Sequence, residues 1–179
     1  MDLLLRLVSI ESPTDDVTAQ REIQAILADE LAAIGFRTRR LAGVETGGAL
    51  FARPERRRSG ASSQLLVIHS DTVWPVGTLE TMPAEESDGI LRGPGAFDAK
   101  GGVAILLRAL TLLHEQGLEP EVTPVVLINA DEEIGSPETT RPILRLARVC
   151  CRALVLEPGL GPEGRLKTAR KGITRFEIR

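Results

Sequence analysis

The sequence predicts an α/β fold in which helices cover a central sheet. Stretches with a helical apolar stripe alternate along the chain with short apolar strands. Two of these strands, Leu65–Ile68 and Val122–Asn129, are continuous apolar runs, which indicates that both of their faces are covered. The chain has 179 residues, 42% of them hydrophobic, and this length suffices for one buried core without disulfide bonds.

Four elements are expected before the first of those strands. They are two helices and two strands, at Asp2–Val8, Asp15–Ile34, Arg37–Leu41 and Ala49–Arg53. Pro13 and its neighbours separate the two helices, and Thr14 is expected to cap the second one. Gly35 is expected to end that helix, because glycine readily takes a positive φ.

Five elements are expected after Leu65–Ile68. The first is a turn at Asp88-Gly89 between two extended pieces, followed by a helix at Lys100–Gln116. A buried strand at Val122–Asn129, a helix that begins at Ser136-Pro137 and a third buried strand at Ala153–Leu156 come next. Ser136 is expected to cap its helix, with Pro137 at the first helical position. Two extended segments, Arg165–Arg170 and Ile173–Ile178, are expected to follow.

Composition excludes several classes of partner. The chain carries 22 Lys and Arg against 25 Asp and Glu, whereas proteins that bind nucleic acids or membrane surfaces usually show a basic excess. The one basic run, Arg56–Arg58, lies in a polar stretch and is interpreted as a solvated loop. No apolar stretch approaches the roughly 20 residues that a bilayer requires, and the N-terminus lacks the basic region of a secretory signal. Cys150 and Cys151 are adjacent, and neighbouring cysteines seldom form a disulfide bond with each other. This favours a reducing, cytoplasmic setting.

Acidic residues and a histidine follow the predicted buried strands. Four segments carry them: His69-Ser70-Asp71, Asp98 after a glycine-rich turn, Asp131-Glu132-Glu133, and Glu157. In open α/β sheets, sites form beyond the carboxyl ends of the strands, so these side chains are expected at one edge. Because carboxylates at one place repel each other, the cluster predicts a bound cation, with a metal ion as the obvious candidate.

Each of these short motifs also has a purely structural interpretation. His69 and Asp71 point to the same side of an extended segment, so Asp71 can orient a metal-binding imidazole, or the pair simply ends a strand. The side chains of Glu132 and Glu133 diverge, so one can bind metal while the other acts as a general base. The alternative is an acidic surface loop.

The segment Gly93–Gly102 places four glycines and one proline around Asp98. Such a backbone can aim a single carboxylate, although an ordinary turn with Asp98 as a helix cap would look the same. The segment is neither a phosphate-binding loop nor a dinucleotide fingerprint, which disfavours a nucleotide-binding domain.

Taken in order, the motifs resemble the zinc-dependent metallopeptidase family of glutamate carboxypeptidase, aminoacylase, acetylornithine deacetylase and succinyl-diaminopimelate desuccinylase. The matching pieces are His69-Ser70-Asp71-Thr72-Val73, Gly93-Pro94-Gly95-Ala96-Phe97-Asp98-Ala99-Lys100-Gly101-Gly102, Asp131-Glu132-Glu133-Ile134-Gly135-Ser136 and Glu157-Pro158. The glutamate carboxypeptidase branch is the most similar. The resemblance implies a three-layer catalytic domain with a mostly parallel mixed sheet between helices.

The resemblance also implies a role for each residue of the cluster. His69 and Glu157 would bind a first metal ion, Glu133 a second one, and Asp98 would bridge both. Asp71 would orient His69, and Glu132 would be the general base. The peptide bond after Asp98 is expected to be cis. Zn²⁺ is the expected metal, with Co²⁺ or Mn²⁺ as alternatives.

The chain also departs from the family. Full-length members are longer and insert a lid or dimerisation domain before one more histidine ligand, but no histidine follows Glu157 here. The first metal site is therefore complete and the second is not. We expect residues 1–170 to be the N-terminal part of the catalytic domain, truncated, and residues 171–179 to begin the lid, with most of the dimerisation surface absent.

The implied activity is hydrolysis of a peptide or amide bond in a small peptide by metal-activated water. A deacylase of N-acyl amino acids would use the same metal centre and remains an alternative. A non-catalytic metal-binding fragment is the alternative from another class.

Overall fold

The computed structural model describes residues 2–161, 163–169, 172 and 176–178. Over these residues the chain forms four α-helices, α1 (Asp2–Val8), α2 (Val17–Ala33), α3 (Gly101–Glu115) and α4 (Thr140–Val149). The strands are β1 (Phe36–Leu41), β2 (Ala49–Pro54), β3 (Ser63–His69), β4 (Glu85–Ser87), β5 (Ile90–Arg92), β6 (Thr123–Asn129) and β7 (Arg152–Val155). No helix in the described part of the chain is long and apolar enough to cross a bilayer.

The central sheet of the described residues has five strands in the order β1-β2-β6-β3-β7. The β6–β3 and β3–β7 pairs are parallel, while β2 runs antiparallel to both β1 and β6. Four of the five strands therefore share one direction, as the resemblance implied. The carboxyl ends of β3, β6 and β7 consequently lie along one edge of the sheet.

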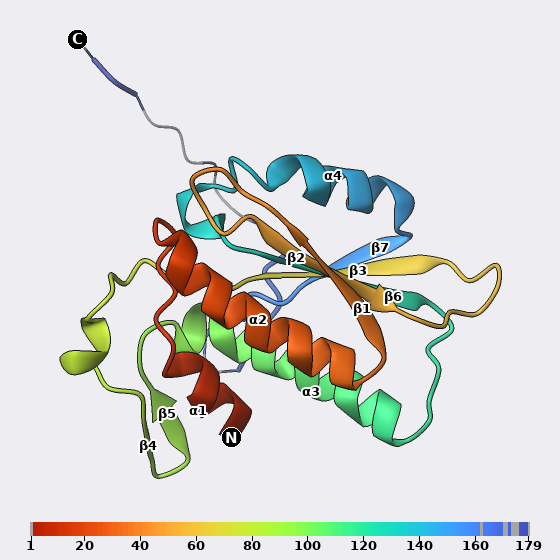
Figure 1. Cartoon of the computed structure of the whole chain (residues 1–179), viewed down its shortest axis with the longest axis horizontal. Coiled ribbons are helices and arrows are strands. Elements are labelled where there is room, and N and C mark those ends of the chain that lie inside the picture. Colours follow the sequence, from red (N-terminus) through yellow and green to blue (C-terminus); the bar gives the residue numbers. More distant parts are fainter. Residues whose placement is uncertain (1, 162, 170–171, 173–175, 179) are drawn as a thin grey trace.

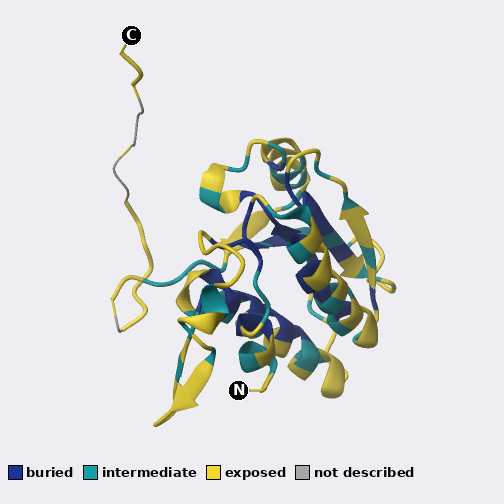
Figure 2. Ribbon diagram, turned by 60° about the vertical axis from the view of Figure 1, so that its left-hand side comes forward, coloured by how far each residue is buried: buried dark blue, intermediate teal, exposed yellow. Residues whose placement is uncertain are grey.

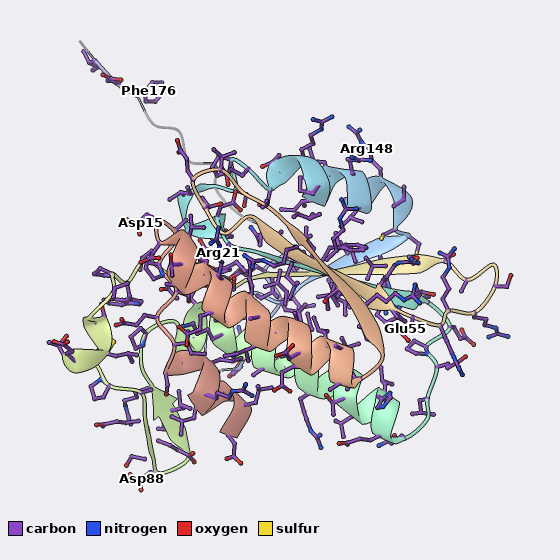
Figure 3. All side chains as sticks on the ribbon, viewed as in Figure 1. Asp15, Arg21, Glu55, Asp88, Arg148 and Phe176 are labelled. Atoms are coloured by element: carbon purple, nitrogen blue, oxygen red, sulfur yellow. The ribbon has the colours of Figure 1, made fainter. Side chains whose placement is uncertain are left out.

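Helices cover both faces of this sheet, so the three-layer prediction is confirmed (Figure 1). On one face, α1, α2 and α3 bury a core that includes Leu27, Leu106 and Ile128. On the other face, α4 packs through Ile143 and Leu146 against apolar side chains of the sheet. Burial is concentrated where these layers meet (Figure 2). Arg148 lies on the outer side of α4 (Figure 3).

Helix α2 does not begin as predicted. Its N-cap is Asp16, whose side chain accepts hydrogen bonds from the backbone N–H groups of Thr18 and Ala19 at 2.8 and 2.9 Å. Thr14 was expected at this position, but its hydroxyl donates to the distant Asp71 carboxylate instead. Both residue types are good caps, so local pattern alone could not decide between them.

The prediction that α4 begins at Ser136-Pro137 is wrong. Ser136 has φ of +56°, and the helix begins at Thr140. Ser136 instead belongs to the turn after β6, where its N–H donates to the Asp131 carbonyl at 2.7 Å. A residue in the left-handed region cannot serve as an ordinary N-cap, which is extended.

Strand β7 forms close to the expected residues but is not buried. Leu154 and Val155 are 47% and 63% exposed. Within the described residues β7 pairs only with β3 and lies at the edge of the sheet, and α4 packs over the neighbouring strands instead. A short apolar run in a sequence does not show whether a helix or another strand will cover it.

The two expected C-terminal extended segments form no strand within residues 163–169, 172 and 176–178, all of which are exposed. Arg165 makes a single antiparallel bridge with Leu160. Much of the predicted beginning of the lid, including Lys171 and Ile173, lies outside the described residues.

Candidate metal centre

The residues singled out from the sequence meet at the carboxyl edge of the parallel strands. His69 is the last residue of β3 and pairs in register with Asn129, the last residue of β6. Glu132 and Glu133 lie on the turn that follows β6, and Glu157 follows β7. Asp98 reaches the same place from the turn Ala96–Lys100 that precedes α3.

His69 is 1% exposed, and its two ring nitrogens face different partners. Nε2 lies 3.1 Å from Oδ1 of Asp98 and 3.4 Å from Oε1 of Glu157. Nδ1 lies 3.0 Å from the carbonyl oxygen of Asp71 and 3.3 Å from its Oδ1. An imidazole held at Nδ1 by acceptors presents Nε2 to the cluster, which is the usual arrangement of a metal-binding histidine.

Three side chains come close enough to share one cation. One potential ligand atom from each of His69, Asp98 and Glu133 lies within 4.8 Å of the other two. Glu157 approaches the same Nε2 of His69. The resemblance implied that Glu133 serves a second metal ion and Glu157 the first, and the structure brings these two carboxylates and Asp98 around the one imidazole of His69.

Asp71 is fully buried, and hydrogen-bond donors surround its carboxylate. Oδ2 accepts from the Thr14 hydroxyl at 2.8 Å and from the Glu133 N–H at 3.2 Å. Oδ1 accepts from the Glu132 N–H at 3.2 Å, on the side that faces His69. Asp71 therefore connects the end of β3 with the turn that carries both glutamates, and no oxygen of it is left free for a cation.

Asp131, the first acid of its motif, is also fully buried and does not join the cluster. Its carboxylate accepts hydrogen bonds from the backbone N–H groups of Glu138 and Thr139 at 2.8 and 3.0 Å, from the Thr139 hydroxyl, and from the Asn129 amide at 3.2 Å. This carboxylate holds the turn after β6 against the start of α4.

Glycine allows the Asp98 turn to reach its place. A Cβ at Gly102 would collide with the carbonyl oxygen of Leu156, so the first turn of α3 lies directly against the backbone that leads to Glu157. Gly95 has φ of +71°, and a side chain there would meet Thr72 at 2.6 Å. The peptide bond between Asp98 and Ala99 is cis, as the resemblance implied.

The charges of the cluster shift its titration. Burial disfavours the charged form of His69, but hydrogen bonds and charge from Asp71 and Glu157 outweigh burial and raise its pKa to about 11. The hydrogen bond with His69 lowers the pKa of Glu157. Desolvation, together with the neighbouring carboxylates, raises the pKa of both Glu132 and Glu133. The site thus favours positive charge at its centre.

One imidazole with several carboxylates is a donor set that zinc accepts in proteins. The hydrogen bonds of the described residues show whether this donor set could take a metal ion. The side chains of Glu132 and Glu133 accept no hydrogen bond from these residues. Asp98 and Glu157 both face Nε2 of His69, and their side chains also contact each other. The open carboxylate oxygens fit a cation.

Thr14 is the residue of this site that the sequence analysis missed. It lies 57 residues before Asp71 and was assigned to a helix cap. Asp16, two residues later, is also a residue type that caps helices well, and this feature of the sequence could have indicated that the Thr14 hydroxyl is available for another partner.

The fold and the site together define an α/β domain with a candidate metal centre beyond the carboxyl ends of its parallel strands. Residues 65–169 match the family described as peptidase family M20/M25/M40, and the chain belongs to this family.

Two curated relatives match most of the chain. Carboxypeptidase G2 from Pseudomonas sp. (strain RS-16) is 33% identical over 177 residues, which cover 98% of this chain and 42% of the relative. A succinyl-diaminopimelate desuccinylase from Beijerinckia indica is 35% identical over 158 residues, which cover 82% of this chain and 39% of that protein. The chain thus spans about two fifths of the length of these relatives.

Solved structures show the same fold. The M20 family metallo-carboxypeptidase Sso-CP2 from Sulfolobus solfataricus matches 90% of this chain and 38% of its own, with a TM-score of 0.72 and 21% identity. Human carnosine dipeptidase 1 matches 86% of this chain and 37% of its own, with a TM-score of 0.70 and 20% identity.

Proposed function

We propose that the chain is the N-terminal part of the catalytic domain of a zinc-dependent peptidase that hydrolyses a peptide or amide bond. The observation that carries the proposal is the orientation of His69. Its Nδ1 faces Asp71, while its Nε2 faces Asp98 and Glu157. Family membership supports the hydrolytic chemistry.

Four side chains would hold metal. His69, Asp98 and Glu157 would surround a first zinc ion, and Asp98 with Glu133 would supply part of a second site. Bound zinc polarises a carbonyl group and lowers the pKa of bound water to near neutrality. Co²⁺ or Mn²⁺ would find acceptable ligands in the same set.

Glu132 is proposed as the general base. Its backbone N–H donates to Asp71, which fixes the turn, while its carboxylate accepts no hydrogen bond from the described residues. Desolvation raises the pKa of Glu132, which moves this carboxylate toward the range that suits a base at neutral pH. The carboxylate would take a proton from the attacking water and deliver it to the leaving nitrogen.

The proposed substrate is a small peptide, because the similarity to carboxypeptidase G2 covers nearly the whole chain. The second candidate is an N-acyl amino acid, which the similarity to succinyl-diaminopimelate desuccinylase favours. Both reactions cleave an amide carbon–nitrogen bond with the same base.

The chain alone would hydrolyse slowly. We propose that residues 1–170 supply one complete metal site and part of another, and that residues 171–179 begin a lid. The free thiols of Cys150 and Cys151 are compatible with the proposed cytoplasmic setting.

The test compares Glu132→Gln with the unchanged chain on a C-terminal glutamate dipeptide and on an N-acyl amino acid, both with added zinc. We expect Glu132→Gln to bind zinc as the unchanged chain does and to hydrolyse the substrates about 10²-fold more slowly, or slower still. Glu119→Gln removes the same charge at the opposite edge of the sheet and should change neither property. Equal hydrolysis by Glu132→Gln and the unchanged chain would overturn the role of this base.

A further inference from the structure

The hydroxyl of Thr14 lies in the segment between α1 and α2 and faces the buried carboxylate of Asp71. Thr14 is 7% exposed, and its Oγ1 donates to Oδ2 of Asp71 at 2.8 Å. The two backbone N–H groups that share this carboxylate, those of Glu132 and Glu133, are both 3.2 Å away. The hydroxyl bond has the ordinary length of an O–H···O bond, whereas both N–H bonds are at the long end of their range, so the hydroxyl is the best-formed of these three hydrogen bonds to the carboxylate.

Other contacts hold the Thr14 segment in place. Thr72 N–H donates to the Ser12 carbonyl at 2.9 Å, and Pro13 forms a parallel bridge with Thr72. The Ser12 hydroxyl donates to the Ser70 carbonyl at 2.8 Å, and the Gln20 amide donates to the Ser12 carbonyl at 2.6 Å. Removing the Thr14 hydroxyl therefore leaves the segment anchored to the end of β3.

The hydroxyl has no role in starting α2, because Asp16 caps that helix. Its target, Asp71, faces Nδ1 of His69 through Oδ1 and accepts from the turn that carries Glu132 and Glu133. A rotation of this carboxylate would therefore disturb the imidazole and the turn together.

We propose that Thr14 is a positioning residue: its hydroxyl sets the orientation of the Asp71 carboxylate, and through it the ring of His69 and the turn that carries Glu132 and Glu133. The consequence for metal binding rests on the proposed function, whereas the positioning itself is a property of the metal-free chain.

The test uses Thr14→Val, which keeps the shape and removes the hydroxyl, and Thr14→Ser, which restores it. Thr46→Val is the matched control. Thr46 is 3% exposed, and its hydroxyl donates to the Glu138 carboxylate at 2.6 Å and accepts from the Gly48 N–H at 3.2 Å. Thr46→Val therefore also removes a buried hydroxyl that donates to a carboxylate, but one that does not contact the cluster. Each variant is measured by amide and imidazole NMR without metal, by zinc titration and by thermal unfolding.

In the metal-free chain we expect Thr14→Val to shift the amide signals of Glu132 and Glu133 and the imidazole signals of His69. Only His114 must be distinguished from His69, because the chain has two histidines. Thr14→Ser should restore the signals, and Thr46→Val should leave them unchanged. In the zinc titration, Thr14→Val should bind about tenfold more weakly, the lower end of what outer partners of a metal ligand contribute.

Failure of the proposed function and failure of the role of Thr14 give different results. If the unchanged chain binds no zinc, the proposed metal site fails, and the NMR comparison still decides the role of Thr14. If Thr14→Val shows the signals and the zinc affinity of the unchanged chain, the inference is wrong. The inference is also wrong if Thr46→Val perturbs the cluster as much as Thr14→Val does, since the effect would then be general destabilisation.

Discussion

Two kinds of carboxylate lie side by side at the carboxyl edge of the sheet. Asp71 and Asp131 are fully buried, and each accepts at least three hydrogen bonds from nearby N–H and O–H groups. Asp98, Glu133 and Glu157 are partly or largely exposed. Among the described residues, Asp98 and Glu157 face His69 and each other, and the Glu133 side chain accepts no hydrogen bond. The number of hydrogen-bond donors around each carboxylate, not the acidity of the motif, separates the structural carboxylates from the proposed metal ligands.

The physical reason is compensation of charge. A buried carboxylate is tolerated where N–H and O–H dipoles replace the water it has lost. Open carboxylates that share a site repel one another, so their negative charge favours a cation at the centre. The pKa of His69 responds to negative charge in the same way: hydrogen bonds and charge from Asp71 and Glu157 outweigh the burial of the ring and raise its pKa to about 11.

The largest effect is expected at an open carboxylate. Asp98→Asn should weaken zinc binding by more than the roughly 10–100-fold that an outer partner contributes, because it removes a proposed ligand. The side chain is 59% exposed, so the free energy of unfolding of the metal-free protein should change by only about 0.5 kcal/mol. Zinc titration and urea unfolding give the two values. Unchanged zinc affinity would place Asp98 among the structural carboxylates.

The same substitution at a carboxylate whose oxygens already accept hydrogen bonds should lower stability and leave zinc binding intact. Asp131→Asn replaces a charged acceptor that faces the N–H groups of Glu138 and Thr139, and the loss should be about 2 kcal/mol in the free energy of unfolding. The folded fraction of Asp131→Asn should still bind zinc. Urea unfolding beside Asp98→Asn provides the comparison, and a larger loss of stability in Asp98→Asn would reverse the distinction.

The smallest effect is expected at Glu138, an acceptor near the surface that binds the loop between β1 and β2. The hydroxyl of Thr46 and then the N–H groups of Glu45 and Val44 lower the pKa of Glu138 below its usual 4.5. A lowered pKa means that the folded state binds the proton less readily than the unfolded state. The stabilisation is therefore present above pH 4.5 and is lost as the pH falls through the lowered pKa.

The measurement is urea unfolding of the unchanged chain and of Glu138→Gln across that acidic range. The unchanged chain should be the more stable one near neutral pH, and the difference should shrink in acid. A difference that does not depend on pH would show that the charge of Glu138 contributes nothing.

Much of the fold could be predicted from the sequence, because apolar runs and helix stops are local. Helix α1 matches its prediction, and β3 and β6 begin within two residues of theirs. The residues that meet at the sheet edge could also be named, because parallel strands end together. Which acids stay open could not be predicted, because the donors that saturate Asp71 come from residues 57 to 62 positions away.

We propose that the open carboxylates and His69 form a metal site in this chain. Elemental analysis of the purified, zinc-loaded chain beside His69→Ala tests it most directly. We predict about one tightly held zinc ion per chain, lost in His69→Ala, because one site has its ligands and the other is incomplete. A chain that retains no zinc, or a His69→Ala variant that retains as much as the unchanged chain, would contradict the claim.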